Sequence, residues 1–218
     1  MAVWSVLCDF DGTISKGDVT DRLLEVFGKP EWRTLEAEWI AGRIGSRECM
    51  RRQIACLDAS GEELDAVLDG IEIDETFADF ADAVRTRGGE LSIVSDGLDY
   101  AIRRILRRYH LSGLPVYACH LVPDGPRGWR LEFPHADIDC VPASGLCKCA
   151  IARRARAMGK KTLLIGDGRS DFCASGHVDF VFAKGLLAEH CAAQQFPHRR
   201  VADFADVLSF FPAIPGIN

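Results

Sequence analysis

The segment AVWSVLCDFDGT, residues 2–13, decides the fold of this chain. Its apolar run Val3–Leu7 predicts a buried β-strand, and two aspartates, Asp9 and Asp11, follow that run directly. Two carboxylates at the end of a buried strand repel each other and resist ionisation. The segment therefore predicts either a strand whose aspartates are paired by a cation or no strand at all.

Further apolar runs favour the strand. They recur at Leu91–Val94, Val116–Val122, Thr162–Ile165 and Phe180–Phe182, and most are separated by segments with helical periodicity. This alternation is typical of a parallel sheet with helices on both faces. A Pro-Asp-Gly-Pro-Arg-Gly turn before Trp129–Phe133 predicts a hairpin attached to the sheet. We therefore predict the α/β class with a Rossmann-like parallel sheet.

Residues 16–88 contain no strand-like run. They show helical patterns near Val19–Phe27, Pro30–Ala41, Ser46–Cys56, Gly61–Leu68 and Glu75–Arg87. A connection of this length is far longer than one crossover needs. We therefore expect residues 17–70 to form a small helical cap domain and residues 1–16 and 71–218 to form the core domain.

Polar residues follow the predicted strands, at the edge of the sheet where ligands bind in open α/β folds. They are Asp9, Asp11, Gly12 and Thr13, then Ser95, Asp96 and Gly97, and then Gly166, Asp167, Gly168, Ser170 and Asp171. Lys148 stands before the helix that leads into the strand Thr162–Ile165. The carboxylates suit Mg²⁺, whereas a hydroxyl, backbone amides and a lysine suit a phosphoryl group. One aspartate could attack phosphorus and the other could move the proton.

Each motif alone has a plainer interpretation. Asp9-Phe10-Asp11-Gly12 could be a turn, and Ser95-Asp96-Gly97 could cap a helix at Leu98–Tyr109. Lys148 alone could lie on the surface. Their joint occurrence in this order favours one site.

The set of motifs resembles that of the haloacid dehalogenase superfamily of phosphatases, in the branch of phosphoserine phosphatase, and the helical insert is similar to that superfamily's first type of cap. The resemblance implies that Asp9 is the nucleophile and Asp11 the general acid/base. It further implies Mg²⁺ bound by Asp9, the backbone carbonyl of Asp11 and Asp167, with Asp171 orienting the metal's water or Lys148. The phosphoryl group would be held by Ser95, Asp96, Gly97 and Lys148.

Finer details concern the substrate. Three further features resemble the methionine-salvage phosphatases of 2-hydroxy-3-keto-5-methylthiopentenyl-1-phosphate. They are Arg47-Glu48 with Gln53, Phe133-Pro134-His135, and Cys140 with Cys147-Lys148. Asp18 falls where phosphoserine phosphatases hold an amino group with a glutamate, so phosphoserine, phosphocholine and phosphoethanolamine are alternatives. We expect substrate contacts from Asp18, Arg22, Arg51, Gln53 and His135.

Bulk properties narrow the function class. The net charge of −6 argues against general nucleic-acid binding. No stretch of the sequence approaches 18 consecutive apolar residues, so we expect no membrane span. Nine cysteines without a preceding signal peptide lead us to expect free thiols in the reducing cytoplasm. A metal clamped by Cys140, Cys147, Cys149 and His135 is the less favoured alternative.

The expected partner is a small phosphorylated metabolite, and the chain could be a monomer or a homodimer. The alternative to an enzyme is a regulator that is phosphorylated on Asp9 without turnover. Asp11 and the cap favour the enzyme, because a regulator needs neither an acid/base nor a shielded site.

Overall fold

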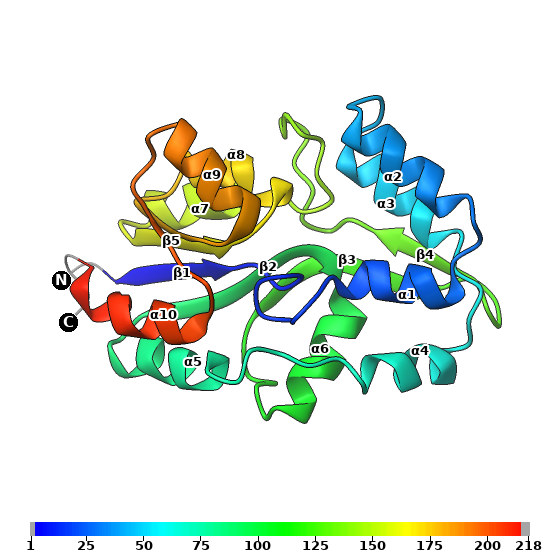
Figure 1. Cartoon of the computed structure of the whole chain (residues 1–218), viewed down its shortest axis with the longest axis horizontal. Coiled ribbons are helices and arrows are strands. Elements are labelled where there is room, and N and C mark those ends of the chain that lie inside the picture. The colour runs from blue at the N-terminus through cyan, green and yellow to red at the C-terminus, as the bar shows by residue number, and fades with distance from the viewer. Residues whose placement is uncertain (1–2, 215–218) are drawn as a thin grey trace.

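The computed structural model describes residues 3–214, and its centre is one seven-stranded sheet with helices on both faces (Figure 1). The strands are β1 Trp4–Cys8, β2 Glu90–Leu98, β3 Val116–Pro123, β4 Trp129–Glu132, β5 Lys161–Gly166, β6 Phe180–Ala183 and β7 His198–Arg200. Their order is β4-β3-β2-β1-β5-β6-β7. All neighbours are parallel except β3 and β4, which form the predicted antiparallel hairpin. The predicted α/β class is confirmed.

Residues 3–214 contain ten α-helices, of which the first nine lie between strands and the tenth follows β7. Between β1 and β2 lie α1 Val19–Phe27, α2 Trp32–Ile40, α3 Ser46–Ile54, α4 Gly61–Leu68 and α5 Phe77–Thr86, and after β2 come α6 Asp99–Arg108, α7 Lys148–Ala157, α8 Phe172–Ser175, α9 Gly185–Ala193 and α10 Phe204–Phe210. Helices α5, α6 and α10 cover one face of the sheet, and α7, α8 and α9 cover the other (Figure 1). Among the helices of residues 3–214, none has the length and apolar character of a membrane span.

The central strand β1 is buried along its whole length because its side chains alternate between two cores. Val6 and Cys8 belong to the apolar cluster under α5 and α10, whereas Leu7 belongs to the cluster under α7 and α9. On the first side, the ring of Phe204 lies 4.9 Å from that of Phe77. Burial of each such side chain stabilises the fold by roughly 1.5–3 kcal/mol. The strand end that carries Asp9 is therefore fixed from both faces.

The helices between β1 and β2 divide into two groups. Helices α1 and α4 lie along the sheet's edge beside α6, whereas α2 and α3 pack against each other and stand near β4 (Figure 1). Their buried residues Leu23, Ile54 and Leu64 share one apolar cluster with the sheet. The separation of residues 17–70 into a cap domain therefore stays a prediction.

Candidate active site

Strands β2, β1 and β5 are adjacent and parallel, so their carboxyl ends meet at one edge of the sheet. β2 lies on one side of β1, and β5, which comes later in the chain, lies on the other side. The strand order therefore reverses at β1, and α/β sheets bind ligands at such a position. Asp9 follows β1, Ser95 lies near the end of β2, and Asp167 follows β5. The predicted strand ends are thus brought together.

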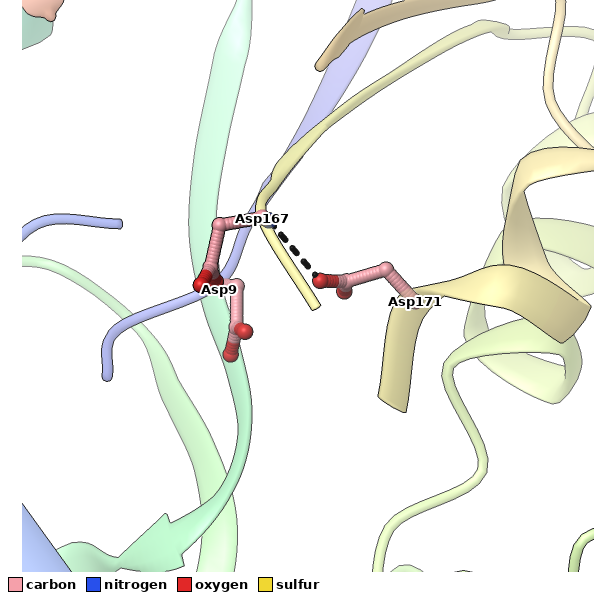
Figure 2. A group of neighbouring side chains, drawn as sticks. All are labelled: Asp9, Asp167 and Asp171. Atoms are coloured by element: carbon pink, nitrogen blue, oxygen red, sulfur yellow. Dashed lines mark hydrogen bonds between the residues drawn. The ribbon is translucent and has the colours of Figure 1, made fainter. Parts of the chain in front are cut away.

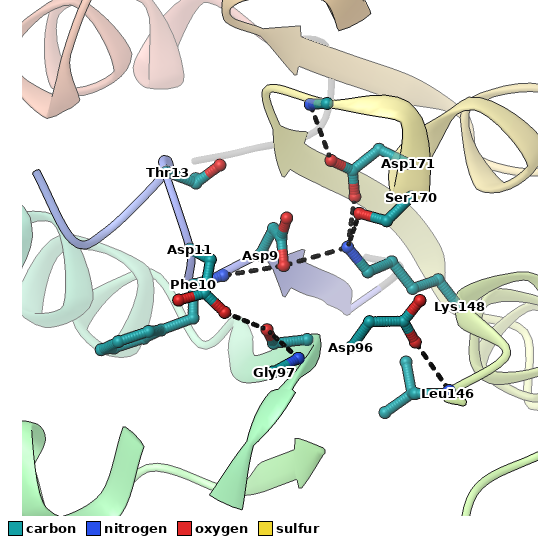
Figure 3. A network of polar contacts seen from close by, with 12 residues as sticks. Asp9, Phe10, Asp11, Thr13, Asp96, Gly97, Leu146, Lys148, Ser170 and Asp171 are labelled. Atoms are coloured by element: carbon teal, nitrogen blue, oxygen red, sulfur yellow. Dashed lines mark hydrogen bonds and ion pairs between the residues drawn. The ribbon is translucent and has the colours of Figure 1, made fainter. Parts of the chain in front are cut away.

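A buried lysine lies between two of the aspartates. The Nζ atom of Lys148 is 3.0 Å from Asp9 Oδ1 and 2.6 Å from Asp171 Oδ1, and it donates to Ser170 Oγ at 3.1 Å (Figure 3). Burial alone would lower the pKa of Lys148, but Asp171 and Asp9 raise it by more, so the amine stays charged. Lys148 is therefore a fixed positive charge beside Asp9.

Three carboxylates form the predicted acidic cluster. Asp9, Asp167 and Asp171 each offer an oxygen within 4.8 Å of the others (Figure 2). Burial raises the pKa of Asp9 and of Asp167, and Asp171 raises both further. Carboxylate oxygens held this close without enough positive charge fit a hard divalent cation such as Mg²⁺.

The three carboxylates of this cluster differ in how many of their oxygen atoms are free of other contacts and can bind a metal. Asp171 is fully buried, and its Oδ2 accepts from the backbone N–H groups of Asp167 at 3.2 Å and Gly168 at 3.3 Å. Its Oδ1 pairs with Lys148. Asp167 accepts only the hydroxyl of Thr13, at 2.9 Å, among these side-chain contacts. Asp171 is therefore held as a positioning group, whereas Asp9 and Asp167 have oxygen atoms left to bind a cation.

Asp11 points away from the acidic cluster. Its Oδ1 accepts from the N–H of Val19 at the start of α1, at 2.9 Å, and its Oδ2 accepts from Ser95 Oγ at 3.3 Å. Burial raises the pKa of Asp11 to about 6. A carboxyl group with such a pKa can both give and take a proton near neutral pH.

Two glycines make this packing possible. Gly12 has a φ of +71°, and a Cβ there would lie 2.7 Å from Asp167 Oδ2. A Cβ at Gly97 would lie 2.2 Å from Asp11 Oδ2. Any larger residue at either position would displace a carboxylate.

Ser95, Asp96 and Gly97 end β2 rather than cap α6. The N-terminal cap position of α6 is Leu98, and no side chain caps this helix. The N–H of Gly97 donates to Ser95 Oγ at 3.0 Å. The carboxylate of Asp96 accepts from the N–H of Leu146 at 2.7 Å and from Ser46 Oγ at 3.2 Å. The side chain of Asp96 thus links α3 to the segment before Lys148 instead of facing Asp9.

A cavity of about 370 Å³ lies between the strand ends and helices α1–α3. Its lining combines Asp9, Asp11, Ser95, Asp96 and Asp167 of the core with three carboxylates from the helical side and an apolar wall. The residues contributed by the helices include Asp18, Asp21, Glu36, Trp39, Ile40, Met50 and Gln53. Gln53 donates to Glu36 Oε2 at 2.9 Å. Of the predicted substrate residues, Asp18 and Gln53 line the cavity.

The structure does not bring the other three predicted substrate residues to this cavity. Arg22 pairs with Glu25 at 3.5 Å, and Arg51 pairs with Glu48. His135 packs edge-on against Tyr117, with ring centroids 5.2 Å apart, and lines a different cavity. None of these three residues is among those that line the cavity over Asp9.

The alternative metal site at the cysteines is wrong. Within residues 3–214, Asp9, Asp167 and Asp171 are the one group of three or more potential ligands that lie close together. Cys140, Cys147, Cys149 and His135 do not form such a group. All nine cysteines are free in the structure.

Comparisons with known proteins agree with this geometry. Residues 6–175 match the sequence profile of the haloacid dehalogenase-like hydrolases. The chain is 31% identical to the 2-hydroxy-3-keto-5-methylthiopentenyl-1-phosphate phosphatase of Brevibacillus brevis over 93% of this chain and 92% of that protein. It is 28% identical to the phosphatase of the same name from Exiguobacterium sp., over 96% and 97%. A solved phospho-aspartyl intermediate analogue of phosphoserine phosphatase shares the fold, with a TM-score of 0.73 at 19% identity over 96% of this chain and 99% of that one.

Proposed function

Because this chain belongs to the haloacid dehalogenase-like hydrolase family, we propose that it is a Mg²⁺-dependent phosphatase that hydrolyses a small phosphomonoester through an aspartyl-phosphate. The observation that carries the proposal is the meeting of Asp9, Asp11 and Lys148 at the carboxyl ends of adjacent strands, under one cavity. Nine free cysteines favour the reducing cytoplasm as its compartment.

The contacts of Asp9 favour one of its two carboxylate oxygens as the reacting atom. Oδ1 accepts from the N–H of Phe10 at 2.9 Å and pairs with Lys148 at 3.0 Å. Oδ2 is therefore the oxygen left to attack phosphorus. A bond forms between Oδ2 and phosphorus while the ester P–O bond breaks, and the carboxyl proton of Asp11 passes to the leaving oxygen. Water then attacks phosphorus while Asp11 takes a proton from it. The bond between Oδ2 and phosphorus breaks, so that phosphate leaves and the Asp9 carboxylate is restored.

The surrounding residues stabilise the phosphoryl group. The Lys148 ammonium and the Ser95 hydroxyl are placed to receive its negative oxygens, and their positions are fixed before the substrate arrives. Asp9, the backbone carbonyl of Asp11 and Asp167 would hold Mg²⁺, which when bound neutralises charge on the same oxygens. Asp171 keeps Lys148 in position through their 2.6 Å ion pair.

The residues of helices α1–α3 would select the organic part of the substrate. Trp39, Ile40 and Met50 form an apolar wall that suits a thioether, whereas Asp18 and Glu36 can accept hydrogen bonds from hydroxyl groups. Burial raises the pKa of Asp18 to about 7, and Asp11 adds to the shift, so this carboxyl can donate as well as accept.

These features support the relatives' substrate, 2-hydroxy-3-keto-5-methylthiopentenyl-1-phosphate, as the first candidate. Arg169 is the one basic side chain in the cavity lining of residues 3–214. A substrate with a second anionic group, such as the carboxylate of phosphoserine, therefore meets mainly carboxylates there.

The test is phosphate release by the purified protein with Mg²⁺ and after its removal by a chelator. The panel contains 2-hydroxy-3-keto-5-methylthiopentenyl-1-phosphate, phosphoserine, phosphocholine and phosphoethanolamine. We expect the first compound to have a kcat/KM at least about tenfold above that of phosphoserine, which corresponds to about 1.4 kcal/mol. Stable phosphorylation of Asp9 without turnover of any compound would instead favour the regulator.

A further inference from the structure

Two cysteines lie in contact beside the Lys148–Asp171 ion pair. Cys149 follows Lys148 in the first turn of α7, and Cys173 lies in α8, two residues after Asp171. Their Sγ atoms are 2.9 Å apart, and both thiols are free. Each half of the ion pair thus has one of these cysteines close to it in the chain.

The two thiols differ in access. Cys149 is 4% exposed, whereas Cys173 is half-buried and lines a second cavity together with Trp39 and Ser170. Trp39 and Ser170 also line the substrate cavity, so the two cavities adjoin. A small oxidant that enters this region reaches Cys173 first, while the neighbouring protein shields Cys149.

We propose that Cys149 and Cys173 are a redox pair that a hydroperoxide converts to a disulfide, and that this bond slows turnover. The sulfur of Cys173 attacks the peroxide, the O–O bond breaks, and one molecule of water or alcohol leaves, which gives a sulfenic acid on Cys173. The sulfur of Cys149 then attacks the sulfenic sulfur, the S–O bond breaks, and the thiol proton of Cys149 leaves with the hydroxyl as water. The peroxide is reduced by two electrons and the two thiols are oxidised.

The bond would act on the active site through the helix starts. A disulfide holds its sulfur atoms about 2.05 Å apart, so the two Sγ atoms must approach by roughly 0.9 Å. This movement falls on the first turn of α7, which carries Lys148, or on the start of α8, which follows Asp171. Catalytic groups need their positions to within roughly 0.5 Å. We therefore expect oxidation to lower kcat roughly ten- to hundredfold.

The experiment treats the reduced protein with hydrogen peroxide, removes the peroxide, and measures turnover of p-nitrophenyl phosphate with Mg²⁺. Peptide mass mapping under non-reducing conditions detects a Cys149–Cys173 link. We expect that link, the fall in kcat, and recovery with dithiothreitol. The effect on turnover rests on the proposed function, but the link does not, so mass mapping tests the pair even if no turnover is found.

Variants separate the pair from the other thiols. Cys173→Ser and Cys149→Ala should each show the same turnover before and after peroxide treatment. Both variants are made so that the test still stands if one of them does not fold. Two control variants should lose turnover as the parent does. They are Cys140→Ser, which removes the thiol beside Cys147, and Cys56→Ser, two residues after the end of α3. The proposal is overturned if Cys149 and Cys173 stay unlinked while turnover falls, or if Cys140→Ser protects.

Discussion

At the scale of single residues, the two aspartates after β1 have different surroundings. Asp9 is held against Lys148, at 3.0 Å, whereas Asp11 is held by the N–H of Val19 and by Ser95. Burial raises the pKa of Asp9, and Lys148 opposes that rise, so its ammonium favours the ionised carboxylate that a nucleophile requires. Asp11 lacks such a close cation and keeps a pKa of about 6. Two chemically identical side chains are thereby suited to different steps.

Asp9→Asn should lower kcat for p-nitrophenyl phosphate by roughly 10⁴-fold or more, because an amide oxygen is a poor nucleophile. Asn has nearly the same shape, and Lys148 keeps Asp171 as its partner, so the fold should persist. Phosphate release and circular dichroism measure the two properties. Asp82→Asn is the control, since Asp82 lies on the surface and pairs with Arg85. Turnover by Asp9→Asn within tenfold of the parent would refute a nucleophilic role.

Asp21 provides a test of the acidic cavity by pH. Loss of solvent raises the pKa of Asp21 from 3.8 to about 7, and Asp18 and Glu36 add to the shift. Because the folded pKa lies above the unfolded one, the contribution of this group to stability is lost as the pH rises from about 4 to about 7. Asp21→Asn, which stays uncharged, should therefore raise Tm at pH 8 and change it little at pH 4. We expect a rise of only roughly 1–3 °C at pH 8, because the side chain is exposed and solvent screens its charge.

Thermal unfolding of the substrate-free protein at the two pH values measures this difference. Asp82→Asn again serves as the control, because its exposed ion pair predicts no gain at pH 8. An equal shift of Tm by Asp21→Asn at both pH values would show that ionisation of Asp21 does not destabilise the fold.

At the scale of elements, the strands and their ends were predictable from the sequence. The apolar runs locate β1, β5 and β6 because these strands are buried on both faces. The run at β3 locates that strand too, although several of its side chains are exposed. Parallel strands then bring their carboxyl ends together, which is why Asp9, Ser95 and Asp167 could be assigned to one site. In contrast, β7 has the sequence His198-Arg199-Arg200, and its polar, mostly exposed side chains give no strand signal.

The helical side of the cavity was less predictable. Glu36 and Trp39 line it because of how α2 packs against α3, and no local pattern in the sequence specifies that packing. For the same reason Arg22 and Arg51, which were expected to contact substrate, instead pair with Glu25 and Glu48 on their own helices. The position of a residue on a helix does not determine which neighbour that helix will face.

The turn after β1 provides an element-scale prediction. Gly12→Ala places a Cβ 2.7 Å from Asp167 Oδ2 at a φ of +71°, so Asp167 must move. We expect the Mg²⁺ concentration for half-maximal turnover to rise roughly ten- to hundredfold. Gly17→Ala is the matched control, because a Cβ there meets nothing within 4 Å. Mg²⁺ titrations of turnover compare the two variants, and equal midpoints would contradict the assignment of Asp167 as a metal ligand.

At the scale of the whole molecule, the start of α3 connects the helices over the cavity to the segment that leads to Lys148. Arg47 donates from Nε to the carbonyl of Ser144 at 3.1 Å and from its guanidinium to the carbonyl of Asp137 at 3.3 Å. The Ser46–Asp96–Leu146 hydrogen bonds lie beside these contacts. Substrate binding under α2 and α3 and the placement of Lys148 therefore depend on one set of contacts.

Arg47→Ala should weaken this connection, because hydrogen bonds from a charged donor contribute roughly 1.5–3 kcal/mol each. With α3 less firmly held, the cavity closes less often over a substrate, and we expect KM to rise roughly tenfold for the best compound of the panel. Arg51→Ala is the matched control, since Arg51 lies one turn further along α3 and its partly exposed pair with Glu48 contributes little. Steady-state kinetics should leave the KM of Arg51→Ala within about twofold of the parent. If Arg51→Ala raised KM as much as Arg47→Ala, then Arg51 would contact the substrate as the sequence predicts, and α3 would have to turn when the substrate binds.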